Sequence, residues 1–98
     1  MTSTKQQLLE NCKYIKQLIE HDQLDIATFL NETILDIEYT LTQDKTLLGA
    51  KLLVAFGGPT IYINTRYSKI EGYWSSDQVT IPYSNDELDD YLIETFCL

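Results

Sequence analysis

The apolar residues of this 98-residue chain change their spacing twice, and that change limits the possible fold more than any other feature. Near the N-terminus they recur every three or four residues, the spacing of one helix face: Leu8, Cys12, Ile15 and Ile19. From LDIEYTL (35–41) onward they alternate with polar residues, which is typical of a half-buried strand. The helical spacing returns in DELDDYLIETF (86–96). This order predicts a single α+β domain.

The middle of the chain is predicted to form a four-stranded antiparallel meander over residues 35–75. Its strands are expected at 35–41, 47–56, 60–65 and 69–74. The second is apolar on both sides, which favours a central place in the sheet, and one of its sides is expected to carry Ala50, Leu52, Val54 and Phe56. QVTIPY (78–83) offers a further short edge strand, ended by Pro82.

Three helices are expected around the meander. The first covers residues 4–20 and has Ser3 as its cap. A short second helix covers 24–31, capped by Asp22. The third is acidic, begins after Ser84 or Asn85, and is expected to pack on the same face of the sheet as the others.

Gly57-Gly58-Pro59 raises the question of a phosphate-binding loop. Such a loop opens a helix, whose N-terminal amides hold the anion. Here the strand TIYINT follows directly, and no Lys-Ser or Lys-Thr pair is present. Glycine allows positive φ and proline fixes φ, so the sequence predicts a hairpin turn. Gly72, between bulky neighbours, predicts either a β-bulge or a large side chain crossing over it.

The net charge excludes several partners. Fifteen Asp and Glu stand against seven Lys and Arg, for a formal charge of −8. Direct binding to nucleic acid or to an anionic membrane requires a basic face, so we expect neither. No apolar run is long enough for a membrane span, and the N-terminus resembles no signal peptide. A cytoplasmic protein is therefore expected, with Cys12 buried in the core and not paired with Cys97.

The sequence offers little for catalysis. Nucleophilic catalysis usually needs a histidine base, and His21 is the only histidine. No Cys, His or carboxylate spacing matches a zinc site or a calcium loop. We therefore expect no enzymatic activity, no catalytic residue, no metal and no cofactor.

The acids are segregated along the chain. Seven lie between Glu20 and Asp44, and five between Asp86 and Glu94, with no Lys or Arg in either span. If the two segments meet in the fold, they form one negative face that could enter a basic groove built for nucleic acid. The candidate contact residues are Asp86, Glu87, Asp89, Asp90 and Glu94, with Asp36 and Glu38 as second choice. The alternative is a solvated face that only keeps the domain soluble.

A second alternative places the contact on aromatic residues, which are common at the centres of protein–protein interfaces. Its candidates are Tyr62, Tyr67, Tyr73 and Trp74. The two surfaces differ in their expected response to salt. Binding through the acidic residues should weaken as the salt concentration rises, whereas binding through the aromatic residues should hardly change.

Residues 34–96 resemble a group of small proteins from Gram-positive phages and mobile elements. The resemblance rests on GGPTIYINT (57–65) and EGYW (71–74), supported by LDIEYTL and NDELDDYLIETF. Similar proteins usually carry Asp at the position of Asn64 and Gly at that of Ser75. The setting implies an inhibitor of host defence, of the anti-CRISPR or anti-restriction type, several of which mimic nucleic acid.

Taken with the charge, the resemblance predicts a non-enzymatic inhibitor in the host cytoplasm. Its partner would be a basic nucleic-acid-handling enzyme such as the CRISPR effector Cas9. The alternative is an immunity-like or antitoxin-like module that binds another basic protein. The oligomeric state does not follow from the sequence.

Overall fold

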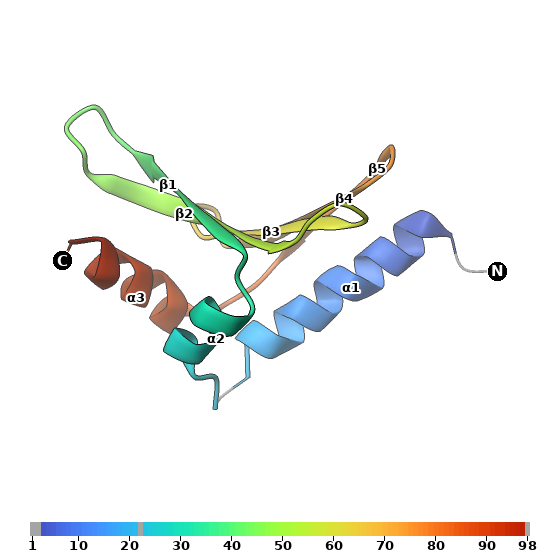
Figure 1. Ribbon diagram of the computed structural model, residues 1–98, viewed down its shortest axis with the longest axis horizontal. Helices are drawn as coiled ribbons and strands as arrows, with labels where there is room; N and C mark the ends of the chain where they lie inside the picture. Colours follow the sequence, from blue (N-terminus) through green and yellow to red (C-terminus); the bar gives the residue numbers. More distant parts are fainter. Residues whose placement is uncertain (1–2, 22, 98) are drawn as a thin grey trace.

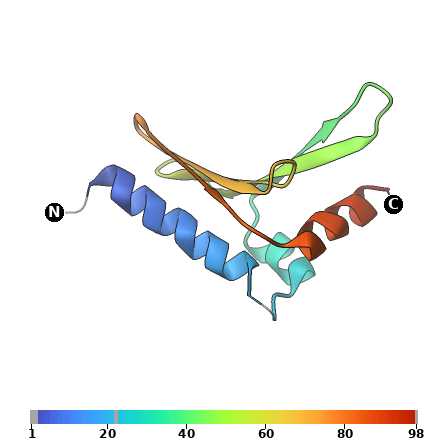
Figure 2. The ribbon, with the colours of Figure 1, turned by 180° about the vertical axis from the view of Figure 1, so that it is seen from behind.

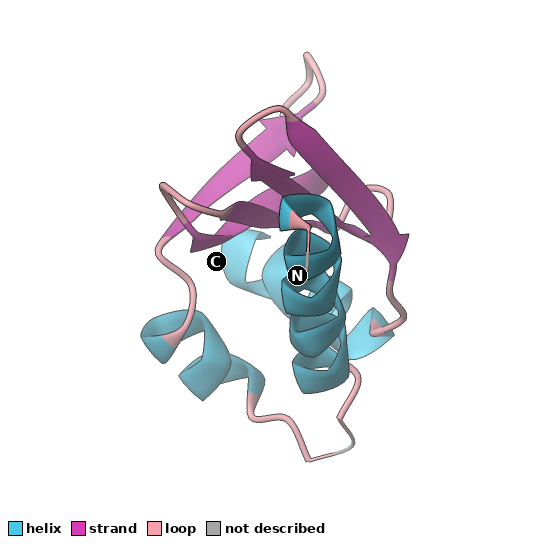
Figure 3. Ribbon diagram, turned by 90° about the vertical axis from the view of Figure 1, so that its right-hand side faces the viewer, coloured by secondary structure: helices cyan, strands magenta, loops and turns pink. Residues whose placement is uncertain are grey.

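The structure, a computed structural model, describes residues 3–21 and 23–97, with side chains through residue 95. The chain runs α1 (Thr4–Ile19), α2 (Ile26–Glu32), β1 (Asp36–Leu41), β2 (Leu47–Ala55), β3 (Thr60–Asn64), β4 (Lys69–Trp74), β5 (Asp77–Pro82) and α3 (Asp86–Cys97). The strands form one antiparallel sheet in sequence order. All the described helices lie on one side of this sheet, and no described element covers its other side (Figures 1, 2 and 3).

The sheet has five strands among the described residues, so the prediction of four was wrong. The chain reverses at Ser75, whose φ is 56°. Residues 77–82 then pair with β4 over its whole length, from Trp74 opposite Asp77 to Lys69 opposite Pro82. Pro82 is compatible with this strand because β5 is at the edge of the sheet. The α+β class is confirmed.

Local capping explains where the helices begin. The Ser3 hydroxyl accepts a hydrogen bond from the Gln6 amide at 3.1 Å, as predicted. The short helix α2 begins two residues later than expected, because Asp25 caps it by accepting from the Thr28 amide at 3.2 Å. The expected cap, Asp22, lies outside the described residues. Asn85 caps α3 by accepting from the Leu88 amide at 3.0 Å.

Gly72 lets α1 approach the sheet closely. A Cβ atom at this position would lie 2.7 Å from Cys12 Sγ and 2.8 Å from Leu8 Cδ1. Neither strand pairing of β4 shows a register shift, so side chains of α1 cross over the glycine and there is no bulge. Cys12 is buried and is a free thiol, as predicted. The side chain of Cys97 lies outside the described part.

A bulge in β2 changes the expected side-chain pattern. The pairing with β3 shifts register between Leu53 and Ala55. Ala50 and Leu52 are buried as predicted, but Phe56 follows the strand and is 77% exposed. Leu35 precedes β1 and is 63% exposed. Strict alternation predicted both as inward-facing, and that prediction fails where the strands end.

Gly57-Gly58-Pro59 forms the turn between β2 and β3, as predicted, and no helix begins there. Gly57 has φ of +104°, a conformation that favours glycine. The Gly58–Pro59 peptide bond is cis. The predicted hairpin turn is therefore confirmed, and it lacks the helix that a phosphate loop of the usual kind opens.

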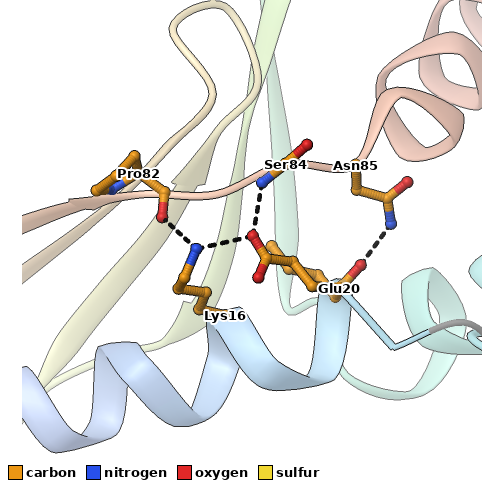
Figure 4. A network of polar contacts seen from close by, with 6 residues as sticks. Lys16, Glu20, Pro82, Ser84 and Asn85 are labelled. Carbon is orange, nitrogen blue, oxygen red and sulfur yellow. Dashed lines mark hydrogen bonds and ion pairs between the residues drawn. The ribbon is translucent and has the colours of Figure 1, made fainter.

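The C-terminal helix contacts the sheet at β2, and less extensively than α1 contacts β4 and β5. Among its described side chains, Leu88 and Leu92 are buried. A polar network fixes the start of α3 (Figure 4). The Glu20 carboxylate accepts from the Ser84 amide at 2.7 Å and pairs with Lys16 at 2.8 Å, while Asn85 Nδ2 donates to the Ile19 carbonyl at 2.5 Å. These bonds join the end of α1 to the segment between β5 and α3.

Candidate functional site

The exposed side of α3 carries four acidic side chains. Asp86, Asp90 and Glu94 follow at four-residue intervals, and Glu87 lies beside them. All four are exposed, whereas Leu88 and Leu92 face the core. Residues four apart on a helix are neighbours about 6 Å apart, so the four carboxylates share one face. We call this set the α3 acidic face.

No cation neutralises the α3 acidic face within the described residues. The only ion pairs among the described residues join Lys16 to Glu20 and Lys51 to Glu71. No Lys or Arg follows Lys69 in the sequence. The four carboxylates therefore present an uncompensated negative field to solvent.

Asp89, the fifth predicted contact residue on this helix, has a structural role. It is half-buried and accepts a hydrogen bond from the Tyr83 hydroxyl at 3.0 Å. Burial raises the pKa of Asp89, and the hydrogen bond from Tyr83 partly opposes that shift. The carboxylate thus connects α3 to the residue that follows β5.

Asp36 and Glu38, the second-choice residues, lie on the opposite side of the sheet. In β1 they alternate with Ile37, which packs against the core and pairs with the buried Leu52. Both acids are exposed and therefore point to the face that carries no helix. The sheet separates these two acids from α3, so they do not share a face with the acids of that helix.

Glu20, which belongs to the first acidic segment, does reach α3. It lines a polar cleft of about 410 Å³ at the junction of the three helices, together with His21, Asp86 and Glu87. The hydrogen bonds from Lys16 and Ser84 lower the pKa of Glu20. The α3 acidic face is therefore extended at its N-terminal end by one carboxylate, which Lys16 already neutralises.

The four aromatic candidates do not form one surface. Tyr62 and Tyr73 lie on the open face of the sheet, with ring centres 6.4 Å apart in an edge-to-face arrangement. Tyr67 is in the β3–β4 turn, between Arg66 and Lys69. Trp74 is partly buried against the core on the helix-covered side. A contact through all four would require partners on both sides of the sheet.

Sequence reasoning missed the role of Glu71, which is only 7% exposed although it lies on the open face. Its carboxylate accepts from Asn64 Nδ2 at 3.2 Å and from the Tyr73 hydroxyl at 3.4 Å, and lies 3.5 Å from Lys51 Nζ. Lys51 also lies over the Tyr62 ring. Strand alternation predicts the face but not the cross-strand neighbours, so this cluster had no local signal.

The described residues contain no group of three or more His, Cys, Asp or Glu placed to hold a metal ion. The His21 ring accepts from the Gln23 amide at 3.1 Å through Nδ1. None of the helices within 3–21 and 23–97 combines the length and apolar character that a bilayer crossing requires.

Comparisons of the chain with protein-family models, with curated proteins and with solved structures find no match.

Proposed function

We propose that this protein is a non-enzymatic inhibitor that binds a basic nucleic-acid-handling enzyme of a host cell through the α3 acidic face. One observation carries the proposal: Asp86, Glu87, Asp90 and Glu94 are exposed together, without a cation partner in the described part of the chain. Exposed carboxylates that are not paired internally remain available to Lys and Arg of another protein.

The spacing of these carboxylates suits a groove that normally holds nucleic acid. Successive acids stand about one helical turn apart, roughly 6 Å, on a rigid support. Such a row resembles the row of phosphates along one strand. It attracts a basic groove over a distance, and this increases the association rate more than the final affinity.

The resemblance to phage and mobile-element proteins directs the proposal to a defence enzyme, with Cas9 as the partner to test. An immunity-like or antitoxin-like role would use the same surface against a different basic protein. Both roles act in the cytoplasm and need neither cofactor nor metal.

The experiment compares two charge-reversal variants in binding and cleavage assays with purified, guide-loaded Cas9. Asp90→Lys with Glu94→Lys changes the α3 acidic face, and Glu10→Lys with Glu32→Lys changes two exposed acids on other helices. Each substitution adds two charges, so both variants go from −8 to −4. Asp89 is left intact because it accepts from Tyr83.

We expect the α3 variant to bind at least about tenfold more weakly, a loss of about 1.4 kcal/mol, and to lose its inhibition of DNA cleavage. The control should stay within about twofold. Association of the unchanged protein should slow steeply with salt, because screening acts beyond about 8–10 Å. Equal losses in the two variants would show that only net charge matters, and no binding by the unchanged protein would remove Cas9 as the partner.

A further inference from the structure

A groove runs between α1 and β5 at the edge of the sheet. It consists of two adjoining hollows of about 460 and 310 Å³, which share Ile81. Both are lined by residues of α1 and β5 together with Ser3, which caps α1, so the groove opens on the outer side of the last strand. Leu9, Val79 and Ile81 give it an apolar floor.

The outer edge of β5 has no strand partner among the described residues. In an antiparallel pair, alternate residues direct their N–H and C=O groups to the partner strand. The Tyr83 amide donates to the Ser68 carbonyl at 3.0 Å, and by alternation Ile81 and Val79 also face β4. Gln78 and Thr80 therefore direct their backbone groups outward. Pro82 has no N–H, and its carbonyl accepts from Lys16 Nζ at 3.1 Å.

The charge of the groove is opposite to that of the whole protein. Lys5, Lys13 and Lys16 line it, and none of its lining residues is Asp or Glu, although the chain has fifteen acids. Lys16 is paired with Glu20. Lys5 and Lys13 form no ion pair within the described residues. Two uncompensated cations thus flank an apolar floor and a free strand edge.

We propose that this groove binds an extended acidic segment of a partner protein, which adds to β5 as a further strand. Backbone bonds to Gln78 and Thr80 would supply affinity that does not depend on sequence, and the groove would select the side chains. This site is separate from the α3 acidic face, and its partner segment has the opposite charge.

The spacing along α1 specifies the bound sequence. Lys5, Leu9 and Lys13 stand four residues apart, about 6 Å per step at 1.5 Å per residue. Two residues of an extended strand span about 6.8 Å. A segment with an acid, an apolar residue and a second acid at alternate positions therefore places a carboxylate at each lysine and the apolar side chain on Leu9. The pattern reads the same in both chain directions.

The test uses a synthetic seven-residue peptide in which Glu, Leu and Glu are separated by single threonines and a further threonine stands at each end. A peptide with Lys in place of both Glu is its control. Titration into the full-length, isotope-labelled protein should shift the amide resonances of Gln78 and Thr80 and slow their hydrogen exchange. The lysine peptide should cause no such change. Equal responses to the two peptides, or shifts confined to α3, would overturn the proposal.

Two pairs of variants separate the contributions of charge and backbone. Lys5→Glu with Lys13→Glu should weaken peptide binding at least about tenfold. Lys45→Glu with Arg66→Glu, the same charge change at two turn residues that do not line the groove, should leave peptide binding within about twofold. Thr80→Pro should abolish binding because it removes an outward amide, whereas Thr80→Val should retain it. Core amide resonances report whether each variant folds.

Sedimentation of the protein without peptide distinguishes a different occupant. We expect a monomer at the concentrations of the titration. A concentration-dependent dimer that is lost in Thr80→Pro would place a second copy in the groove and overturn the proposal of an acidic partner segment.

Discussion

Replacing Gly72 by alanine should weaken the packing of α1 on the sheet. The added methyl group would lie 2.7 Å from Cys12 Sγ, which is 0.7 Å below the 3.4 Å at which ordinary contact begins. Cys12 and Leu8 are both fully buried, so neither can turn into solvent. The clash can be relieved only if α1 moves outward or if both side chains leave their preferred conformations.

The expected cost follows from two opposing terms. Overpacking a buried site costs about 1–3 kcal/mol. Alanine is less flexible than glycine in the unfolded chain, and this stabilises the folded protein by about 0.5–1 kcal/mol. The free energy of unfolding should therefore fall by about 1–2 kcal/mol. For a domain of this size, that lowers the melting temperature by about 5–15 °C.

Urea unfolding, followed by far-UV circular dichroism and by the fluorescence of Trp74, measures this change. Trp74 is the only tryptophan and is packed against the core at the end of the same strand. A second variant, Cys12→Ala, removes the nearest atom. If the clash is the cause, the double variant should be more stable than the sum of the single effects by about 1 kcal/mol.

Gly49→Ala provides the comparison. Its Cβ would lie 2.6 Å from the backbone Cα of Arg66, and backbone atoms yield less readily than side-chain ends. It should therefore destabilise more than Gly72→Ala. Unchanged stability in Gly72→Ala, or strictly additive effects with Cys12→Ala, would refute the packing argument.

The remaining predictions concern titratable groups. Glu71→Ala should lower the free energy of unfolding by about 1–3 kcal/mol because it leaves Asn64 without its acceptor, and Glu71→Gln should cost less in the same urea assay. Burial raises the pKa of Asp89 in the folded protein. The free energy of unfolding should therefore fall as pH rises from the usual Asp pKa through the raised one. In Asp89→Asn this part of the fall should be absent when the free energy of unfolding is measured against pH. Burial also raises the pKa of the Cys12 thiol to about 11, so in a Cys97→Ser variant a thiol reagent at pH 8 should react only after unfolding; fast reaction in the folded protein would contradict this.

The sequence alone determined those parts of the fold that depend on neighbours along the chain. The start of α1 followed from Ser3, and the start of α3 followed from the pair Ser84 and Asn85, of which Asn85 is the cap, because a cap bonds to an amide only a few residues away. The turn followed from the positive φ that Gly57 allows and from the φ that Pro59 fixes. The glycine at 72 signalled a close approach, although not which residues would make it.

Only the tertiary structure decided what depends on contacts between distant segments. The bulge in β2 exposes Phe56. Pairing with β4 over its whole length makes the edge strand that the sequence offered at 78–83 a full fifth strand of the sheet. The sheet places Asp36 and α3 on opposite sides, although both belong to acidic segments.

The same holds for the surfaces proposed to bind partners. The hydrogen bond from Tyr83 holds Asp89 in a half-buried position, away from the exposed acids of α3. The packing of β5 beside α1 forms the groove that is flanked by lysines. These arrangements depend on which segments pack together. Periodicity fixes the side of an element on which a residue lies, but the packing of the elements decides what that side faces.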